Sequence, residues 1–167
     1  MNHTEHRTTA PKSTRCYVVT VSDTRTDDND HGGAAIVELL KQQGHEITGK
    51  IIIPDDPAKI RTVLLEQISS SEVDAIITTG GTGISKRDGT YEVVSLLLDK
   101  QIDGFGEFFR SLSFEEIGPS AMLSRACAGI SRGKIIISVP GSEHAVRLAM
   151  TRLVLPELGH LVREARR

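Results

Sequence analysis

The feature that most constrains the fold is an alternation of short β-rich runs with segments in which apolar residues recur at helical spacing. Runs of Val, Ile and Thr between turn residues are typical of buried strands, and spacings of three and four residues are typical of amphipathic helices. Strands that alternate with helices form a mostly parallel sheet with helices on both faces. The sequence therefore predicts a three-layer α/β/α domain of Rossmann-like type, with strands at residues 16–21, 46–53, 73–79 and 134–139.

The predicted helices lie between and after these strands. One runs from about residue 32 to 43, and apolar residues at helical spacing indicate another over residues 60–68. A third begins near Thr90, whose hydroxyl makes it a candidate N-cap. The last begins after Ser142 and is expected to kink near Pro156, because proline removes a helical hydrogen bond.

The segment between residues 102 and 133 has a weaker pattern. Gly104-Phe105-Gly106 predicts a break in regular structure, because glycine is unfavourable inside helices and strands. Two short helical pieces are expected after it, at about residues 107–114 and 120–128.

The run from Gly80 to Gly89 reads Gly-Gly-Thr-Gly-Ile-Ser-Lys-Arg-Asp-Gly and joins the third strand to a helix; we call it the glycine loop. Glycines at such a turn let backbone N–H groups close around phosphate oxygens, and the helix N-terminus adds roughly half a positive charge. A carboxylate beside a bound phosphate is repelled unless a cation lies between them, so Asp88 predicts a divalent metal such as Mg²⁺. The spacing matches neither the P-loop nor the dinucleotide-binding motif. A glycine turn that serves only as a tight connection is the alternative.

Polar residues also follow the other predicted strands, in Ser22-Asp23-Thr24, Pro54-Asp55-Asp56 and Pro140-Gly141-Ser142. In open α/β sheets the ligand lies beyond the carboxyl ends of the strands, so these segments and the glycine loop are expected to meet in one cleft. Three acidic positions, a glycine turn and several hydroxyls favour phosphate or phosphoanhydride chemistry assisted by a metal. Each acid also has a local alternative, as a turn or capping residue for Asp23 and as a turn and helix start for Asp55 and Asp56.

The length and charge of the chain limit the classes of function. With 167 residues, one domain over residues 14–167 is expected, after a flexible N-terminal tail at residues 1–13. The formal net charge is −2, which gives no electrostatic reason to expect binding to nucleic acid or to an acidic membrane.

The two cysteines, Cys16 and Cys127, lie far apart in apolar runs and show no zinc-site spacing. They are expected to be buried reduced thiols. The first 14 residues lack the apolar segment of a secretory signal, and no stretch approaches the ~20 apolar residues that span a bilayer. We therefore expect a cytoplasmic protein.

Several motifs occur in a specific order: Ser22-Asp23-Thr24, then Gly80-Gly81-Thr82-Gly83 with Arg87-Asp88, then Gly104-Phe105-Gly106-Glu107, and Ser142 after Pro140-Gly141. Together they resemble the molybdenum cofactor biosynthesis family of MoaB- and MogA-type proteins. The resemblance covers roughly residues 14–165. The block Leu-Ser-Phe-Glu-Glu-Ile-Gly at residues 112–118 and the following Leu123-Ser124-Arg125-Ala126 are more like the MoaB branch.

This resemblance implies an enzyme that adenylylates molybdopterin with Mg-ATP and releases pyrophosphate before molybdate is inserted. It links Asp55 and Asp88 to catalysis, and we expect these two carboxylates to position Mg²⁺. It links the glycine loop and the Pro-Gly-Ser turn to binding of the pterin phosphate and the nucleotide. The substrate-binding residues expected on this basis are Ser22, Asp23, Gly80, Gly81, Thr82, Gly83, Glu107, Ser124, Pro140, Gly141 and Ser142.

Three other functions compete with this interpretation. A non-catalytic relative would bind molybdopterin without transferring AMP, but some MoaB-type proteins that lack activity have replaced acidic positions, and Asp55 and Asp88 are both present here. A CinA-like nucleotide pyrophosphatase would share the domain, but no second domain follows it here. A structural oligomer is the third.

One departure from the family pattern is Gly89, where a β-branched residue is usual; its extra backbone freedom could loosen Asp88.

The resemblance further implies a homo-oligomer, a trimer or a trimer-based hexamer, and a possible downstream molybdenum-insertion protein that takes the product. The aromatic residues Phe105, Phe108, Phe109 and Phe114 could form the subunit interface or be buried within one subunit. Whether molybdenum or tungsten is finally inserted stays open.

Overall fold

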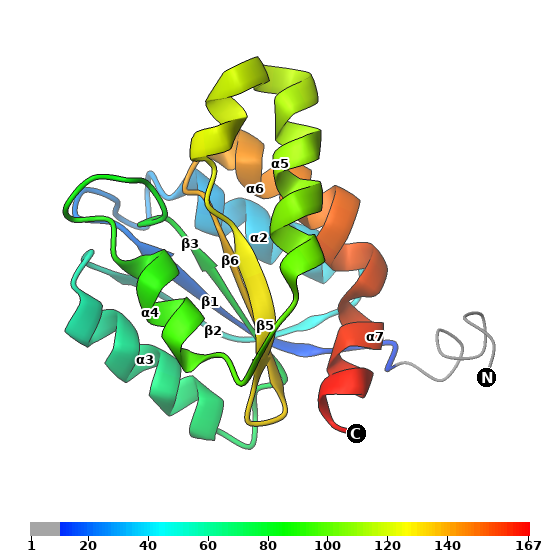
Figure 1. Ribbon diagram of the computed structural model, residues 1–167. Helices are drawn as coiled ribbons and strands as arrows, with labels where there is room; N and C mark the ends of the chain where they lie inside the picture. The colour runs from blue at the N-terminus through cyan, green and yellow to red at the C-terminus, as the bar shows by residue number, and fades with distance from the viewer. Residues whose placement is uncertain (1–10) are drawn as a thin grey trace.

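The computed structural model describes residues 11–167, which form a six-stranded, mostly parallel sheet with the order β2-β1-β3-β6-β5-β4 (Figure 1). The first four strands in that order pair in parallel, and β5 runs antiparallel to both of its neighbours, β6 and β4. The predicted tail falls mostly on residues 1–10, which lie outside the described residues. The strands are β1 (Arg15–Val21), β2 (Glu46–Ile53), β3 (Ala75–Thr79), β4 (Lys100–Gln101), β5 (Cys127–Ser131) and β6 (Lys134–Val139).

Helices cover both faces of the sheet, which confirms the predicted three-layer fold (Figure 1). Because side chains alternate across a strand, Ile77 of β3 packs in one apolar core and its neighbour Ile76 packs in the other. Residues of α2 (His31–Gln42), α5 (Asp103–Ile117), α6 (Glu143–Ala149) and α7 (Leu155–Ala165) belong to the first core, and residues of α3 (Pro57–Ser69) and α4 (Thr90–Leu97) belong to the second.

The predicted break at Gly104-Phe105-Gly106 is wrong, because these residues lie in the first turn of the continuous helix α5. Gly106 has a packing role there. A methyl group at that position would lie 2.6 Å from the carbonyl oxygen of Ala126, so glycine allows the helix to approach the chain just before β5. Phe105 and Phe109, on the same helix face, are buried in the core.

The helix predicted at residues 120–128 is correct only for residues 120–123. A 3₁₀ helix, η1 (Gly118–Leu123), follows α5, and strand β5 begins at Cys127. The strand forms because its residues pair with β6 in antiparallel register, a tertiary contact that local spacing does not reveal.

The C-terminal helical run is formed by α6, η2 (Met150–Val154) and α7. A kink is predicted near Pro156, and the structure has a π-helical turn, η2, just before the helix that contains this proline in its first turn. Proline has no N–H to donate, and a π-helical turn beside it changes the hydrogen-bond pattern so that the missing donor is tolerated.

The predicted N-cap role of Thr90 is wrong as well. Gly89 occupies the N-cap position of α4 without a side-chain hydrogen bond, and Thr90 is the first residue of the helix. The two cysteines are buried and free, as predicted, and burial raises the pKa of the Cys16 thiol to about 12. No helix among residues 11–167 combines the length and the apolar character needed to span a membrane.

The parallel strands are aligned so that they end at the same level. Val21 pairs with Ile53, and Thr79 pairs with both Thr20 and Val139. The next residue, Gly80, has a φ of +92° and donates its N–H to the Val139 carbonyl at 3.1 Å. A methyl group on Gly80 would overlap the carbonyl oxygen of Val21. The loops that follow these strands therefore begin side by side.

Replacement of Gly80 by alanine should lower the free energy of unfolding by about 2 kcal/mol or more, since the new methyl group is strained by both its φ and a backbone overlap. Gly44→Ala is the matched control: Gly44 also has a positive φ of +80°, but no atom lies within 4 Å of the added methyl group. We expect a loss of about 1 kcal/mol for this control. Urea unfolding at one fixed protein concentration measures both, and equal losses would contradict the packing role of Gly80.

Candidate active site at the carboxyl edge of the sheet

The glycine loop is held at both of its ends by backbone hydrogen bonds. At the start, Gly80 is bonded to β6 as described, and Gly81 also has a positive φ of +65°. At the end, the Thr90 N–H donates to the Gly81 carbonyl at 2.9 Å, so the loop closes on itself at the first turn of α4. Because the Gly80 N–H is already used, the amides of Gly81 and Thr82 are the ones that this turn can direct toward an anion.

Asp88 closes the far part of the loop. Its Oδ2 accepts the Ser85 N–H at 2.9 Å, and its own N–H donates to the Ser85 carbonyl at 3.2 Å. Hydrogen bonds from the Ser85 side chain and backbone, with the Arg125 guanidinium nearby, hold the pKa of the Asp88 carboxyl below its usual range. Asp88 is therefore an ionised carboxylate in a fixed orientation at neutral pH.

Asp55, which follows β2, lies against the same loop. Its Oδ1 accepts the Gly89 N–H at 3.2 Å, and its N–H donates to Oδ1 of Asp23 at 3.1 Å. Burial raises the pKa of the Asp55 carboxyl, and the negative charges of Asp88 and Asp23 raise it further. The three acids that follow separate strands are thus brought into one electrostatic cluster, as the aligned strand ends predict.

The neighbouring carboxylates Asp55 and Asp56 have different roles. Asp56 is the N-cap of α3 and accepts the N–H groups of Ala58 at 2.9 Å and Lys59 at 3.3 Å. The alternative of a helix start is therefore correct for Asp56, and it leaves Asp55 to face the glycine loop. Asp23 pairs with Arg87 at 2.7 Å.

The acidic cluster is suited to a cation. Asp55 and Asp88 repel each other, and a positive charge between them would relieve that repulsion. No group of three or more metal-binding side chains of the kind that forms a closed site occurs within residues 11–167. Mg²⁺ is commonly held by one or two carboxylates, with substrate phosphates and waters completing its shell, so two acids at the glycine loop match its requirements.

A pocket of about 360 Å³ lies beside the glycine loop, at the ends of β1, β3 and β6. The hydroxyls of two of its residues have local structural roles: Ser22 Oγ accepts the N–H groups of Thr24 and Arg25, and Ser142 Oγ accepts the N–H of Ala145 as the N-cap of α6. Four predicted site residues line this pocket, which places them in one cleft: Ser22, Gly80, Gly141 and Ser142.

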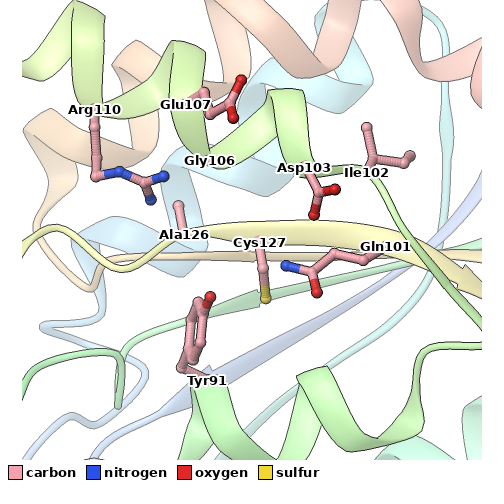
Figure 2. A pocket seen from close by; sticks show the side chains of 9 residues that line it. All are labelled: Tyr91, Gln101, Ile102, Asp103, Gly106, Glu107, Arg110, Ala126 and Cys127. Carbon is pink, nitrogen blue, oxygen red and sulfur yellow. The ribbon is translucent and has the colours of Figure 1, made fainter.

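Glu107 lies in a different cavity. This cavity, of about 230 Å³, is enclosed by α4, α5 and the antiparallel edge of the sheet, and Figure 2 shows Glu107 and Arg110 on α5 above it and Tyr91 on α4 below it. The structure thus separates Glu107 from the four residues of the first pocket. Ser124 lies just after η1, where its N–H donates to the Ala121 carbonyl at 2.9 Å.

Arg125 joins these regions, and sequence reasoning assigned it no role of its own. Its guanidinium donates to the carbonyl oxygens of Thr82, at 2.9 Å, and of Gly83 in the glycine loop. It also pairs with Glu92 and stacks over the Tyr91 ring at 4.9 Å from the ring centroid. The signal was present as part of the Leu-Ser-Arg-Ala motif, but spacing alone does not show that this segment folds back onto the loop.

The chain matches the family model of a probable molybdopterin binding domain over residues 17–160. It is 52% identical to the molybdenum cofactor biosynthesis protein B of Bacillus cereus, an alignment that covers 100% of this chain and 99% of that protein. With the protein of the same name from Bacillus subtilis the identity is 44%, over 100% of this chain and 99% of the relative.

Solved structures agree with these sequence matches. A crystal structure of a molybdenum cofactor biosynthesis protein B superposes with a TM-score of 0.90 at 53% identity, covering 93% of this chain and 98% of the other. The tungsten cofactor synthesizing protein MoaB from Pyrococcus furiosus gives 0.84 at 38% identity, with 95% and 100% covered. CinA from Thermoplasma acidophilum gives 0.58 at 16% identity, with 84% and 95% covered, and thus shares the fold alone.

Removal of the Arg125 guanidinium should loosen the glycine loop. In Arg125→Met we expect the Gly83 and Ser85 amides, both of which donate to Asp88, to exchange with deuterium about tenfold faster, since hydrogen bonds to a charged group contribute about 1.5–3 kcal/mol each. Arg147→Met is the control, because Arg147 pairs with Glu38 and Glu143 away from this loop. Unchanged protection of the two amides in Arg125→Met would show that the loop holds its shape without the clamp.

Proposed function

We propose that this chain, which belongs to the family of molybdenum cofactor biosynthesis protein B and has a role in that pathway, catalyses the Mg²⁺-dependent transfer of AMP from ATP to molybdopterin. The products are adenylyl-molybdopterin and pyrophosphate. The names of its relatives support the pathway, and the chemistry of the site supports the reaction.

The observation that carries the proposal is that Asp55, from the end of β2, lies against the glycine loop that itself contains Asp88. Gly89 donates to Asp55, and Gly83 and Ser85 donate to Asp88, so both carboxylates are oriented by the backbone of the loop itself. A phosphate-binding loop alone needs no acids, since they would repel the ligand. Two carboxylates at such a loop are explained if they hold a metal ion that binds the polyphosphate of the substrate.

Adenylyl transfer needs no nucleophile from the protein. An oxygen of the pterin phosphate attacks the α-phosphorus of ATP, and the bond from that phosphorus to the oxygen that bridges to the β-phosphorus breaks, so that pyrophosphate leaves with that electron pair. The tasks of the protein are to align the two substrates and to balance the charge of the departing group. Asp55 and Asp88 would hold Mg²⁺, which would supply that charge balance.

The remaining residues suit the positioning task. The amides of Gly81 and Thr82 are available for the acceptor phosphate, with Arg125 fixing the carbonyl groups on the other side of the same turn. The 360 Å³ pocket lined by Ser22, Gly80, Gly141 and Ser142 opens next to the loop and offers space for part of a substrate. The product would then pass to a molybdenum-insertion protein.

Asp88→Asn should reduce turnover by about 10²-fold or more while the fold and pterin binding are retained, because the change removes an oriented charge and preserves the shape of the side chain. The assay measures pyrophosphate release and adenylyl-pterin formation with Mg-ATP, with and without molybdopterin. Asp56→Asn is the matched control, since asparagine caps a helix as well as aspartate does, and it should keep normal turnover.

Three results would contradict this function. Normal turnover in Asp88→Asn would remove its central residue. Pterin binding without product in the unmodified protein would indicate a binding protein, and cleavage of ATP or a dinucleotide without pterin would indicate a hydrolase.

We also propose that the chain acts as a homo-oligomer, a trimer or a trimer-based hexamer. The four predicted aromatic residues separate into two groups: Phe105 and Phe109 are buried in the core, whereas Phe108 and Phe114 are 65% and 59% exposed. The two exposed rings lie on α5, and other exposed apolar residues follow them. We define the α5–η1 apolar group as Phe108, Phe114, Ile117, Met122 and Leu123, all of which are exposed. Exposed apolar side chains grouped in this way mark interaction surfaces.

Phe108→Asp combined with Phe114→Asp should shift the protein to monomers, because a charge buried in an apolar interface is strongly unfavourable. Light scattering after size-exclusion chromatography measures the mass. Leu96→Asp serves as the control, since Leu96 is 82% exposed on α4, outside the α5–η1 apolar group. A double variant with an unchanged mass would show that this group is not the interface.

A further inference from the structure

Thr90 is a fully buried residue whose hydroxyl has no hydrogen-bond partner among residues 11–167. Its backbone is held firmly, because its N–H donates to the Gly81 carbonyl at 2.9 Å. A threonine at an N-cap would use its hydroxyl for the helix, but Gly89 occupies the N-cap position here. A buried polar group left unpaired costs about 1–3 kcal/mol, and native proteins contain few of them. Thr90 is one of several buried hydroxyls without a partner among the described residues, and its place beside Gly81 and Asp55 singles it out.

The hydroxyl points into the gap beside Gly81. A methyl group on Gly81 would overlap Oγ1 of Thr90, and it would lie 2.9 Å from Oδ2 of Asp55. The other oxygen of this carboxylate, Oδ1, is the one that accepts the Gly89 N–H. Thr90 Oγ1 and Asp55 Oδ2 therefore face the same small space, which stays open because residue 81 has no side chain.

The Thr90 hydroxyl is able to change its orientation. Threonine in helices occupies two χ1 rotamers of similar energy, in contrast to valine and isoleucine. Asp55 Oδ2 is the nearest charged acceptor on that side of Gly81. A carboxylate that receives a hydrogen bond on each of its oxygens has a fixed plane, whereas one held at Oδ1 alone can still rotate.

We propose that Thr90 is a positioning residue for adenylyl transfer: when substrate occupies the glycine loop, its hydroxyl donates to Oδ2 of Asp55 and fixes that carboxylate. This inference rests on the proposed function, because it takes the role of Asp55 from there. Thr90 acts through Asp55 and makes no contact with the substrate. In the free protein the hydroxyl is unpaired, and the stability lost there is recovered in the loaded state.

This role differs from a structural one in the sign of its effect on stability. A hydroxyl that supports the fold stabilises the free protein, so its removal lowers the melting temperature. An unpaired buried hydroxyl destabilises the free protein, and its replacement by a methyl group of similar size should not lower the melting temperature. Valine keeps the shape of threonine and loses the donor, and serine keeps the donor and loses the methyl group.

The test compares Thr90→Val and Thr90→Ser with the unmodified protein. For Thr90→Val we expect a melting temperature equal to or about 2–4 °C above the unmodified value. We expect kcat for pterin adenylylation to fall about 10–100-fold, as is usual when a group that orients a metal ligand is removed, with the KM for ATP within about twofold. Thr90→Ser should retain most of kcat.

Thr14→Val is the matched control, because Thr14 is also fully buried with an unpaired hydroxyl but precedes β1, at the opposite end of the sheet. It should keep its melting temperature and its kcat. Three results would overturn the role of Thr90: a normal kcat in Thr90→Val, a melting temperature several degrees lower in that variant, or a serine variant as impaired as the valine variant. If the unmodified protein gives no turnover, the proposed function fails, and the role of Thr90 fails with it.

Discussion

The candidate active site depends on how closely β3 packs between β1 and β6 at Gly80. The N–H of Gly80 bonds to Val139 of β6, and its Cα lies against the carbonyl oxygen of Val21 of β1. Gly141, which follows β6, approaches from the other side, since a methyl group there would lie 3.2 Å from the Gly80 Cα. Three strand ends are thus joined without any side chain between them, and this contact sets where the acidic residues and the glycine loop can lie.

The charges around the glycine loop are compensated to different degrees. Asp23 has an arginine partner and Asp88 is held by several hydrogen bonds, which keep the pKa of Asp88 low. Asp55 receives one backbone N–H, and burial with two negative neighbours raises its pKa. The least compensated negative charge is therefore that of Asp55, which lies next to the unpaired hydroxyl of Thr90. Under the proposed function, a bound cation and an ordered substrate would relieve both features, which is the pattern expected of a preorganised site.

The fold was largely predictable because its strands have strong local signals and its parallel order follows from their alternation with helices. The errors in predicted secondary structure fall where tertiary contacts determine the conformation of the segment. Gly106 suggested a break, but its lack of a side chain allows α5 to pack against Ala126, and β5 is a strand because β6 pairs with it. At the site, aligned strand ends predicted the meeting of Asp55 and Asp88. Spacing could not predict the function of Arg125, since its partners Thr82 and Gly83 lie more than 40 residues earlier in the chain.

Arg125 also suggests how assembly and catalysis are connected. It follows η1 by two residues, so the segment that carries the α5–η1 apolar group leads directly to the side chain that clamps the glycine loop. The stem of this segment is fixed by Phe105 and Phe109 in the core, whereas large apolar side chains at its far end are exposed, Met122 by 74%. Association through that apolar group would bury these side chains and, through Arg125, restrict the Thr82 and Gly83 carbonyl groups. The geometry of the glycine loop would then depend on the proposed subunit interface as well as on the sheet.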